Sequence, residues 1–245
     1  MREHKTVNQY VTLEFKNYIL EKLENIRGID NTDKELQQKL LYMAYLDGLA
    51  GARYNNYGNK KAFLSLIKNY SSWEYSDKIC PLALMRLSDN HPELQSFALN
   101  SYNKMIDLGG AFGAAQVPLD VVPSKEELQS VWPEAWNEDN NSPNHDNLSQ
   151  ITQLYKCRNT LVHSFQHRNE SPYPRRNSDV VHYRQFMRSE GDNSFVNLTH
   201  DKFELVYPVQ FLYELCKEIT LKLVDYFIEE EINPFEGYYD NFGEY

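Results

Sequence analysis

Apolar residues recur three and four positions apart along most of this chain, which is the periodicity of amphipathic helices. Alternation with a period of two, typical of strands, is restricted to short stretches in the C-terminal third. The pattern predicts an all-α fold whose helices cover residues 4–27, 33–53, 60–70, 82–87, 92–108, 124–131, 146–167 and 208–231.

Helix-capping residues support several of these boundaries. Gly28 follows the first helix, at a position where glycine is a common C-terminal cap. The run Ser124-Lys125-Glu126-Glu127 fits a capping box, in which the serine and the second glutamate each bind the other's backbone N–H. Pro92 and Pro208 stand at predicted first turns, where a helix needs no N–H group from the proline.

Two long segments interrupt the helical pattern. Residues 109–146 form a proline-containing loop, and residues 168–206 form an insertion rich in basic residues. Within the insertion, Phe195–Leu198 and Lys202–Tyr207 have the composition of short strands joined by a polar turn. We therefore predict a small β-hairpin near residues 195–207.

No internal repeat or clear linker divides the chain, so we predict a single helical domain over residues 1–232. Residues 233–245 are acidic and aromatic, and we expect a tail that is flexible or docks on a partner or on a basic cleft. Near the end of the second predicted helix, a cluster of small residues would let another helix approach closely: Gly48, Ala50, Gly51 and Ala52.

The composition is that of a cytoplasmic protein with a hydrophobic core. Of 245 residues, 41% are hydrophobic, which suffices for a large buried core. Cys80, Cys157 and Cys216 are widely spaced and form no CxxC pair, so neither a disulfide framework nor a zinc site is indicated. We see no secretion signal and no run of about 18 apolar residues, so we expect no membrane partner.

The charge distribution is uneven. The net charge of −10 argues against non-specific nucleic-acid binding by the whole surface. Between Lys156 and Arg188, however, seven basic residues face two acidic ones. This basic island either contacts an RNA backbone or is a solvated loop whose charges pair with the acidic remainder.

Arg158 occupies an unusual position on the helix predicted over residues 146–167. It falls within the apolar stripe, where an unpaired charge is costly, so it needs an anion, a polar cleft or a buried carboxylate. His163 follows five residues later, which on a straight helix means roughly 140° around and roughly 7.5 Å along the axis. Either the helix breaks between the two residues, or a second copy of the chain completes the site. Alternatively, Arg158 is purely structural and His163 is an ordinary surface residue.

The run Arg158-Asn159-Thr160-Leu161-Val162-His163 resembles the R-x4-H signature of HEPN domains. These are all-helical modules of bacterial RNase toxins, antiviral defence proteins and RNA-guided CRISPR ribonucleases. The resemblance implies an up-down helical bundle that acts as a homodimer and cleaves RNA without a metal ion or other cofactor. A second, weaker resemblance to HEPN-type defence proteins covers Leu46–Tyr54 and Phe63-Leu64.

The resemblance also implies roles for individual residues. His163 would transfer protons, Arg158 would grip the scissile phosphate, and Asn159 would orient the site. Basic residues on and after the motif helix are the candidates for RNA binding: Lys156, Arg168, Arg175, Arg176 and Arg184. A cognate antitoxin or a defence-system protein is the expected partner. Some HEPN toxins carry a modifiable tyrosine two residues after the histidine, whereas this chain has Phe165.

Two other functions remain open from the sequence. In a non-catalytic HEPN-like scaffold, the cleft would hold RNA or a protein partner without cutting it. His163 and His167 are four residues apart and could bind a metal, but no nearby cysteine or carboxylate completes the set. The first alternative is tested by whether Arg158 and His163 face a shared cleft.

Overall fold

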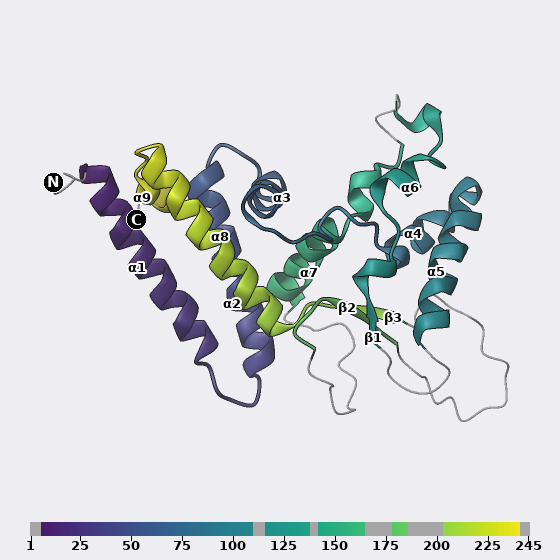
Figure 1. The fold of residues 1–245 in the computed structure, drawn as a ribbon, viewed down its shortest axis with the longest axis horizontal. Coiled ribbons are helices and arrows are strands. Elements are labelled where there is room, and N and C mark those ends of the chain that lie inside the picture. The colour runs from purple at the N-terminus through teal and green to yellow at the C-terminus, as the bar shows by residue number, and fades with distance from the viewer. Residues whose placement is uncertain (1–5, 110–115, 138–141, 165–177, 186–202, 241–245) are drawn as a thin grey trace. The chain divides into compact units, whose positions relative to one another are not determined.

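A computed structural model describes residues 6–109, 116–137, 142–164, 178–185 and 203–240 (Figure 1). Within these ranges the chain forms nine α-helices and one small three-stranded sheet, which confirms the mainly helical fold with a small β element. The residue contacts divide the chain into two compact units. Unit 1 comprises Met1–Trp73, Tyr155–Asn177 and Val209–Tyr245, and unit 2 comprises Glu74–Leu154 and Ser178–Pro208. The single domain expected over residues 1–232 stays a prediction.

Unit 1 is built on long amphipathic helices whose apolar stripes meet in one core. In Figure 1, α1 runs beside α8, and these two helices pack against each other and against α2. Phe15, Leu46, Phe63 and Phe227 are among the side chains fully removed from solvent. The helices of this unit are α1 (Val7–Arg27), α2 (Lys34–Tyr54), α3 (Asn59–Tyr70), the second part of α7 (Gln150–Ser164), α8 (Val209–Glu229) and α9 (Pro234–Asp240). Except for α9, where the sequence pattern predicted no helix, their ends lie close to the predicted boundaries.

Helix α9 corrects the expectation of a flexible tail. Phe235 and Tyr238 pack edge-to-face on Phe15, with ring centroids 5.2 and 5.8 Å away. In the described part of the tail, these aromatic side chains thus pack on the apolar surface of α1. Helix α9 also packs against α2. Residues 241–245 lie outside the described ranges.

The small residues of α2 allow α9 to approach closely, as the sequence predicts. A Cβ atom added to Gly48 would lie 3.1 Å from the Tyr238 ring. On the facing helix, a Cβ added to Gly237 would lie 2.6 Å from the carbonyl oxygen of Ala52. A glycine is therefore needed at position 237, where the α2 backbone leaves no room for a side chain, and Gly48 leaves space for the Tyr238 ring.

Replacing Gly237 by alanine should destabilise the protein by about 1–3 kcal/mol, because the added methyl group overlaps a backbone oxygen that cannot move freely. Urea unfolding followed by circular dichroism measures this. Gly28→Ala is the matched control, since its Cβ would meet only ordinary contacts of 3.5 and 3.6 Å. Equal stability of the two variants would contradict the tight α2–α9 contact.

Unit 2 combines short helices with the sheet. Its helices are α4 (Pro81–Ser88), α5 (Gln95–Gly109), α6 (Lys125–Gln129), the first turn of α7 and four 3-10 turns at Pro92–Leu94, Leu119–Val121, Glu134–Asn137 and His145–Leu148. Ser124 and Glu127 form the predicted capping box at the start of α6.

The sheet differs in part from the predicted hairpin. Its strands β1 (Gln116–Pro118), β2 (His182–Gln185) and β3 (Phe203–Val206) are antiparallel, in the order β1-β2-β3. The second predicted strand is confirmed by β3, but its described partner is β2, a segment that the sequence pattern left unassigned. The first predicted strand, at residues 195–198, lies outside the described ranges.

Buried polar contacts attach the start of α7 to the sheet. The Gln150 side chain donates a hydrogen bond to the Tyr183 hydroxyl over 2.7 Å, and the Tyr207 hydroxyl donates to the Gln150 carbonyl over 3.0 Å. Tyr183 is fully buried, and burial raises its pKa, so it stays a neutral hydrogen-bonding group. Helix α7 therefore begins from a defined anchor in unit 2.

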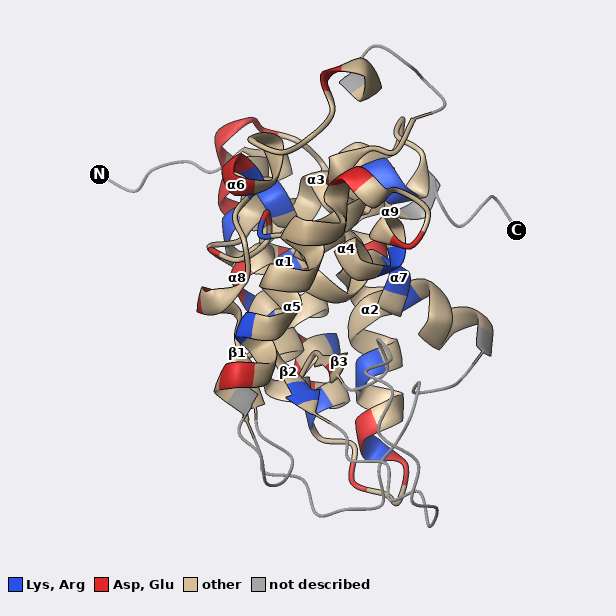
Figure 2. Ribbon diagram, turned by 90° about the vertical axis from the view of Figure 1, so that its right-hand side faces the viewer, with Lys and Arg blue, Asp and Glu red and all other residues tan. Residues whose placement is uncertain are grey.

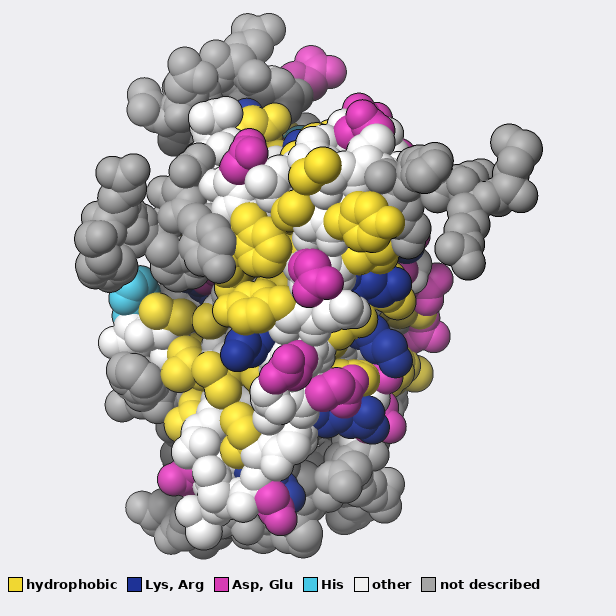
Figure 3. Space-filling model, turned by 90° about the vertical axis from the view of Figure 1, so that its left-hand side faces the viewer, with side chains coloured by type: hydrophobic (Ala, Val, Ile, Leu, Met, Phe, Trp, Pro, Cys, Tyr) yellow, Lys and Arg dark blue, Asp and Glu magenta, His cyan; other side chains and the backbone are white. Residues whose placement is uncertain are grey.

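The surface of unit 1 mixes apolar and charged side chains. Figure 3 shows hydrophobic side chains interspersed with charged ones on the face that carries α1, where Val7, Tyr10 and Tyr18 are exposed.

In the described part of the chain, every helix is too short or too polar to cross a membrane.

Candidate functional site

The motif residues lie on a single unbroken helix. Helix α7 continues from Gln150 to Ser164 and contains both Arg158 and His163. This excludes a helix break as the way to bring the two side chains together. With regular helical geometry, the arginine and the histidine leave the axis in different directions. Arg158 points inward, with 15% of its side chain exposed, whereas His163 is exposed to solvent.

Arg158 is anchored by two neighbouring side chains. Its Nε donates a hydrogen bond to Oδ2 of Asp47 over 2.7 Å, and its Nη2 forms an ion pair with the same oxygen. Its Nη1 donates to Oδ1 of Asn159 over 2.9 Å. Arg158 is therefore paired with a largely buried carboxylate, as the structural alternative proposed, and Asn159 contacts the guanidinium directly.

Asp47 is the site residue that sequence reasoning missed. It lies on α2 four residues after Met43 and three before Ala50, both of which are buried. A carboxylate in an apolar stripe was a signal that a cation should lie opposite it. The sequence pattern placed Asp47 within a resemblance to defence proteins but assigned it no role.

The pairing with Asp47 does not use all the donors of Arg158. A guanidinium has five N–H bonds, and the contacts with Asp47 and Asn159 account for three, so two remain within the described residues. The Tyr155 ring lies one turn earlier on α7, with its centroid 5.9 Å from the guanidinium carbon. The arrangement is a rigidly held cation that still has hydrogen bonds to offer to an anion.

Burial raises the pKa of the Asp47 carboxyl, and the hydrogen bond and charge of Arg158 offset this only in part, so that pKa lies above its ordinary value. The folded protein thus keeps this proton to a higher pH than the unfolded chain does. The stability that Asp47 contributes is complete below its unfolded pKa and is lost as the pH rises through its folded pKa.

We expect the stability of the wild type relative to Asp47→Asn to fall with rising pH across that window, because asparagine does not titrate. Urea unfolding at a series of pH values measures the difference. Asp146→Asn is the control, and here the stability advantage of the wild type should grow with rising pH. There burial acts against ionisation, but the hydrogen bond and charge of Lys125 lower the pKa of Asp146 below its ordinary value. If the stability advantage of the wild type over Asp47→Asn grew with pH instead, the raised pKa of Asp47 would be contradicted.

His163 stands in the last turn of α7 and makes no hydrogen bond or ion pair with any described residue. Its side chain is exposed to solvent. His167, its possible metal-binding partner, lies outside the described ranges. Within those ranges, no group of three or more histidine, cysteine, aspartate or glutamate side chains could hold a metal ion.

The candidate RNA-binding residues have different surroundings. Lys156 is exposed on α7. Arg184 on β2 pairs across the sheet with Glu204, over 2.7 Å between Nη2 and Oε2, so a carboxylate offsets its charge. Figure 2 shows basic positions both on α7 and on the sheet. Arg168, Arg175 and Arg176 lie outside the described residues, so RNA contact by the basic island stays a prediction.

Searches against protein-family models, curated proteins and solved structures found no match for this chain.

Proposed function

We propose that the protein is a metal-independent endoribonuclease of the HEPN type. The observation that supports this best is the anchored Arg158 guanidinium, two of whose N–H donors have no partner among the described residues, on the same helix as an exposed histidine. A fixed cation can hold a phosphate and offset negative charge that develops on its oxygens. A histidine can transfer protons near neutral pH.

In the proposed reaction, the ribose 2′-oxygen attacks the adjacent phosphorus. The new bond from the 2′-oxygen to phosphorus forms as the bond from phosphorus to the 5′-oxygen breaks. One base accepts the 2′-hydroxyl proton, and one acid delivers a proton to the 5′-oxygen. The products are a 2′,3′-cyclic phosphate and a 5′-hydroxyl, so no oxidant or further reactant is needed. His163 performs proton transfer, while Arg158 holds the phosphate oxygens.

The proposed active form is a homodimer. A regular helix separates the two motif side chains by roughly 7.5 Å along its axis and roughly 140° around it, so one copy does not direct both to one phosphate. A two-fold axis would bring the histidine of one copy to the arginine of the other. As a cytoplasmic toxin or antiviral effector, such a dimer would need an antitoxin or another defence protein to restrain it.

Incubation of the purified protein with mixed cellular RNA in EDTA tests the proposal. We expect fragments with 5′-hydroxyl ends, and much slower cleavage by His163→Ala prepared in parallel. Cleavage that requires magnesium and leaves 5′-phosphate ends would refute the proposed mechanism.

A non-catalytic RNA- or partner-binding scaffold is the second candidate. It is favoured by one observation, the engagement of Arg158 with Asp47, which gives the arginine a structural role without any ligand. RNA binding without cleavage in the same experiment would favour the scaffold.

A further inference from the structure

A pocket of about 820 Å³ in unit 1 is lined in part by Tyr155, whose ring centroid lies 5.9 Å from the guanidinium carbon of Arg158. Its floor and walls come from the first two turns of α3 and from one side chain of α7. Tyr155 belongs both to this pocket and to the surroundings of Arg158, because its ring faces the pocket and approaches the guanidinium. The lining side chains are Asn59, Lys60, Lys61, Leu64, Ser65 and Tyr155.

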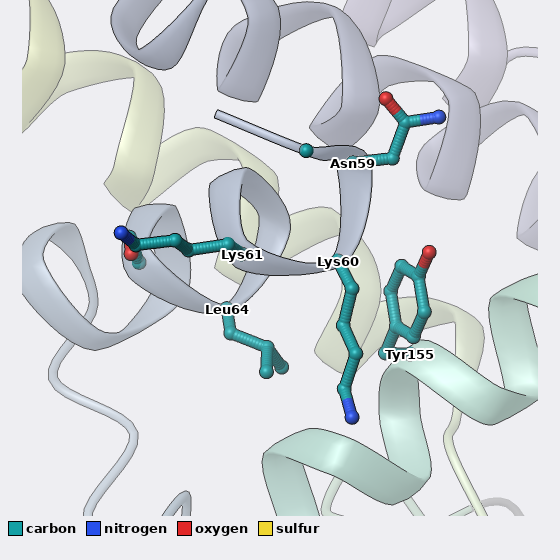
Figure 4. Close-up of a pocket in the computed structure, with 7 residues that line it drawn as sticks. Asn59, Lys60, Lys61, Leu64 and Tyr155 are labelled. Carbon is teal, nitrogen blue, oxygen red and sulfur yellow. The ribbon is translucent and has the colours of Figure 1, made fainter. Parts of the chain in front are cut away.

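The lining combines a flat aromatic surface with positive charge. In Figure 4 the Lys60 side chain runs alongside the Tyr155 ring, while Lys61 points to the other side. Phe63 supports the Tyr155 ring from within the core, with ring centroids 5.5 Å apart. The ring is therefore held in position, and the residues that line the pocket include two lysines and no carboxylate.

Both lysines lie at the N-terminal end of α3. Lys60 and Lys61 lie in its first turn, where the helix dipole is positive and where acidic residues are favoured. This turn contains no acidic residue, and the Nζ atom of Lys61 lies 4.3 Å from the centroid of the Tyr57 ring. An anion in the pocket would add a favourable charge at this positive end of the helix.

We propose that the pocket takes one unpaired nucleotide of an RNA strand, with its base against Tyr155 and Leu64 and its phosphate beside Lys60. The neighbouring phosphate would then reach the remaining donors of Arg158. Aromatic rings bind bases of any sequence through stacking, and lysines bind the backbone, which together suit single-stranded nucleic acid. This inference rests on the proposed function for the identity of the strand, and it adds a substrate subsite to that function.

Fluorescence anisotropy with a labelled single-stranded RNA of about twelve nucleotides tests the pocket. The titrations use the His163→Ala background, so that the probe stays intact. Tyr155→Leu should weaken binding on the order of 10- to 100-fold through lost stacking. Lys60→Gln should reduce the slope of log affinity against log salt by about 0.7, the value for one phosphate contact on a single strand.

Lys68→Gln is the matched control, because it removes the same charge from an exposed position at the other end of α3. It should bind RNA with unchanged affinity and salt dependence. Tyr155→Leu also removes a core contact, so its fold is checked by thermal unfolding. Lys60 is exposed, and its variant tests the pocket independently of folding.

The outcomes separate this inference from the proposed function. If both pocket variants bind RNA like the Lys68 control while the wild type cleaves RNA, the pocket assignment is overturned and the nuclease stands. If both variants lose RNA binding but the wild type does not cleave, the pocket is supported and the nuclease is overturned. Binding of an RNA duplex should not depend on Tyr155, because paired bases cannot enter the pocket.

Discussion

His163→Ala is expected to slow RNA cleavage by a factor on the order of 10²–10⁴, the usual effect of removing a positioned proton-transfer group. His163 is exposed and makes no hydrogen bond within the described residues, so its loss should leave the fold intact. Single-turnover cleavage of a labelled RNA at saturating protein concentration measures the chemical step apart from binding.

Arg158→Lys should impair the same step, because lysine keeps the charge but loses the planar group that contacts Asp47 and Asn159 simultaneously. Arg27→Lys is a suitable control, since Arg27 forms an exposed ion pair with Glu24 on α1. If both motif variants cleave RNA as fast as the wild type, the R-x4-H spacing is a coincidence and the scaffold function is favoured.

Mixing the two inactive variants should restore cleavage to about a quarter of the wild-type rate if each site takes Arg158 from one copy and His163 from the other. In a mixed dimer of Arg158→Lys and His163→Ala, one site carries both changes and the other carries neither. Random exchange makes about half of the dimers mixed, and each mixed dimer has one intact site of two. Cleavage rates measured after subunit exchange therefore show whether one active site contains residues from two copies of the chain.

Each variant mixed with itself is the control and should remain inactive. A strict monomer by light scattering at tens of micromolar, or no recovery after demonstrated exchange, would count against a composite site. Because α7 is continuous, the proposed active site needs a second copy of the chain to bring His163 close to Arg158.

Most of the helices could be predicted from the sequence because helix formation depends on local signals. Periodic apolar positions and nearby caps predicted α1, α2, α3 and α8 to within a few residues. The capping box of Ser124 and Glu127 was equally local and is present. For the same reason Arg158, Asn159 and His163 could be selected as candidates, since the motif is contained in six consecutive residues.

The residues that surround those candidates depend on long-range packing and could not be predicted from local patterns. Asp47 pairs with Arg158 across 111 positions of sequence, and periodicity does not show which distant side chain will lie opposite a buried charge. The pairing of β2 with β1 and β3 is also non-local, and short strands carry too few residues for a clear pattern.

Helix α9 and the pocket beside Tyr155 were undetermined for a related reason. The seven residues of α9 are acidic and aromatic, without a helix-like stripe, and packing on Phe15 and on the small residues of α2 stabilises the helix. The pocket exists because α3 and α7, which are distant in sequence, place Lys60 beside Tyr155. Local propensity selects the elements, but the distance between two side chains on different elements is set by how the whole core packs.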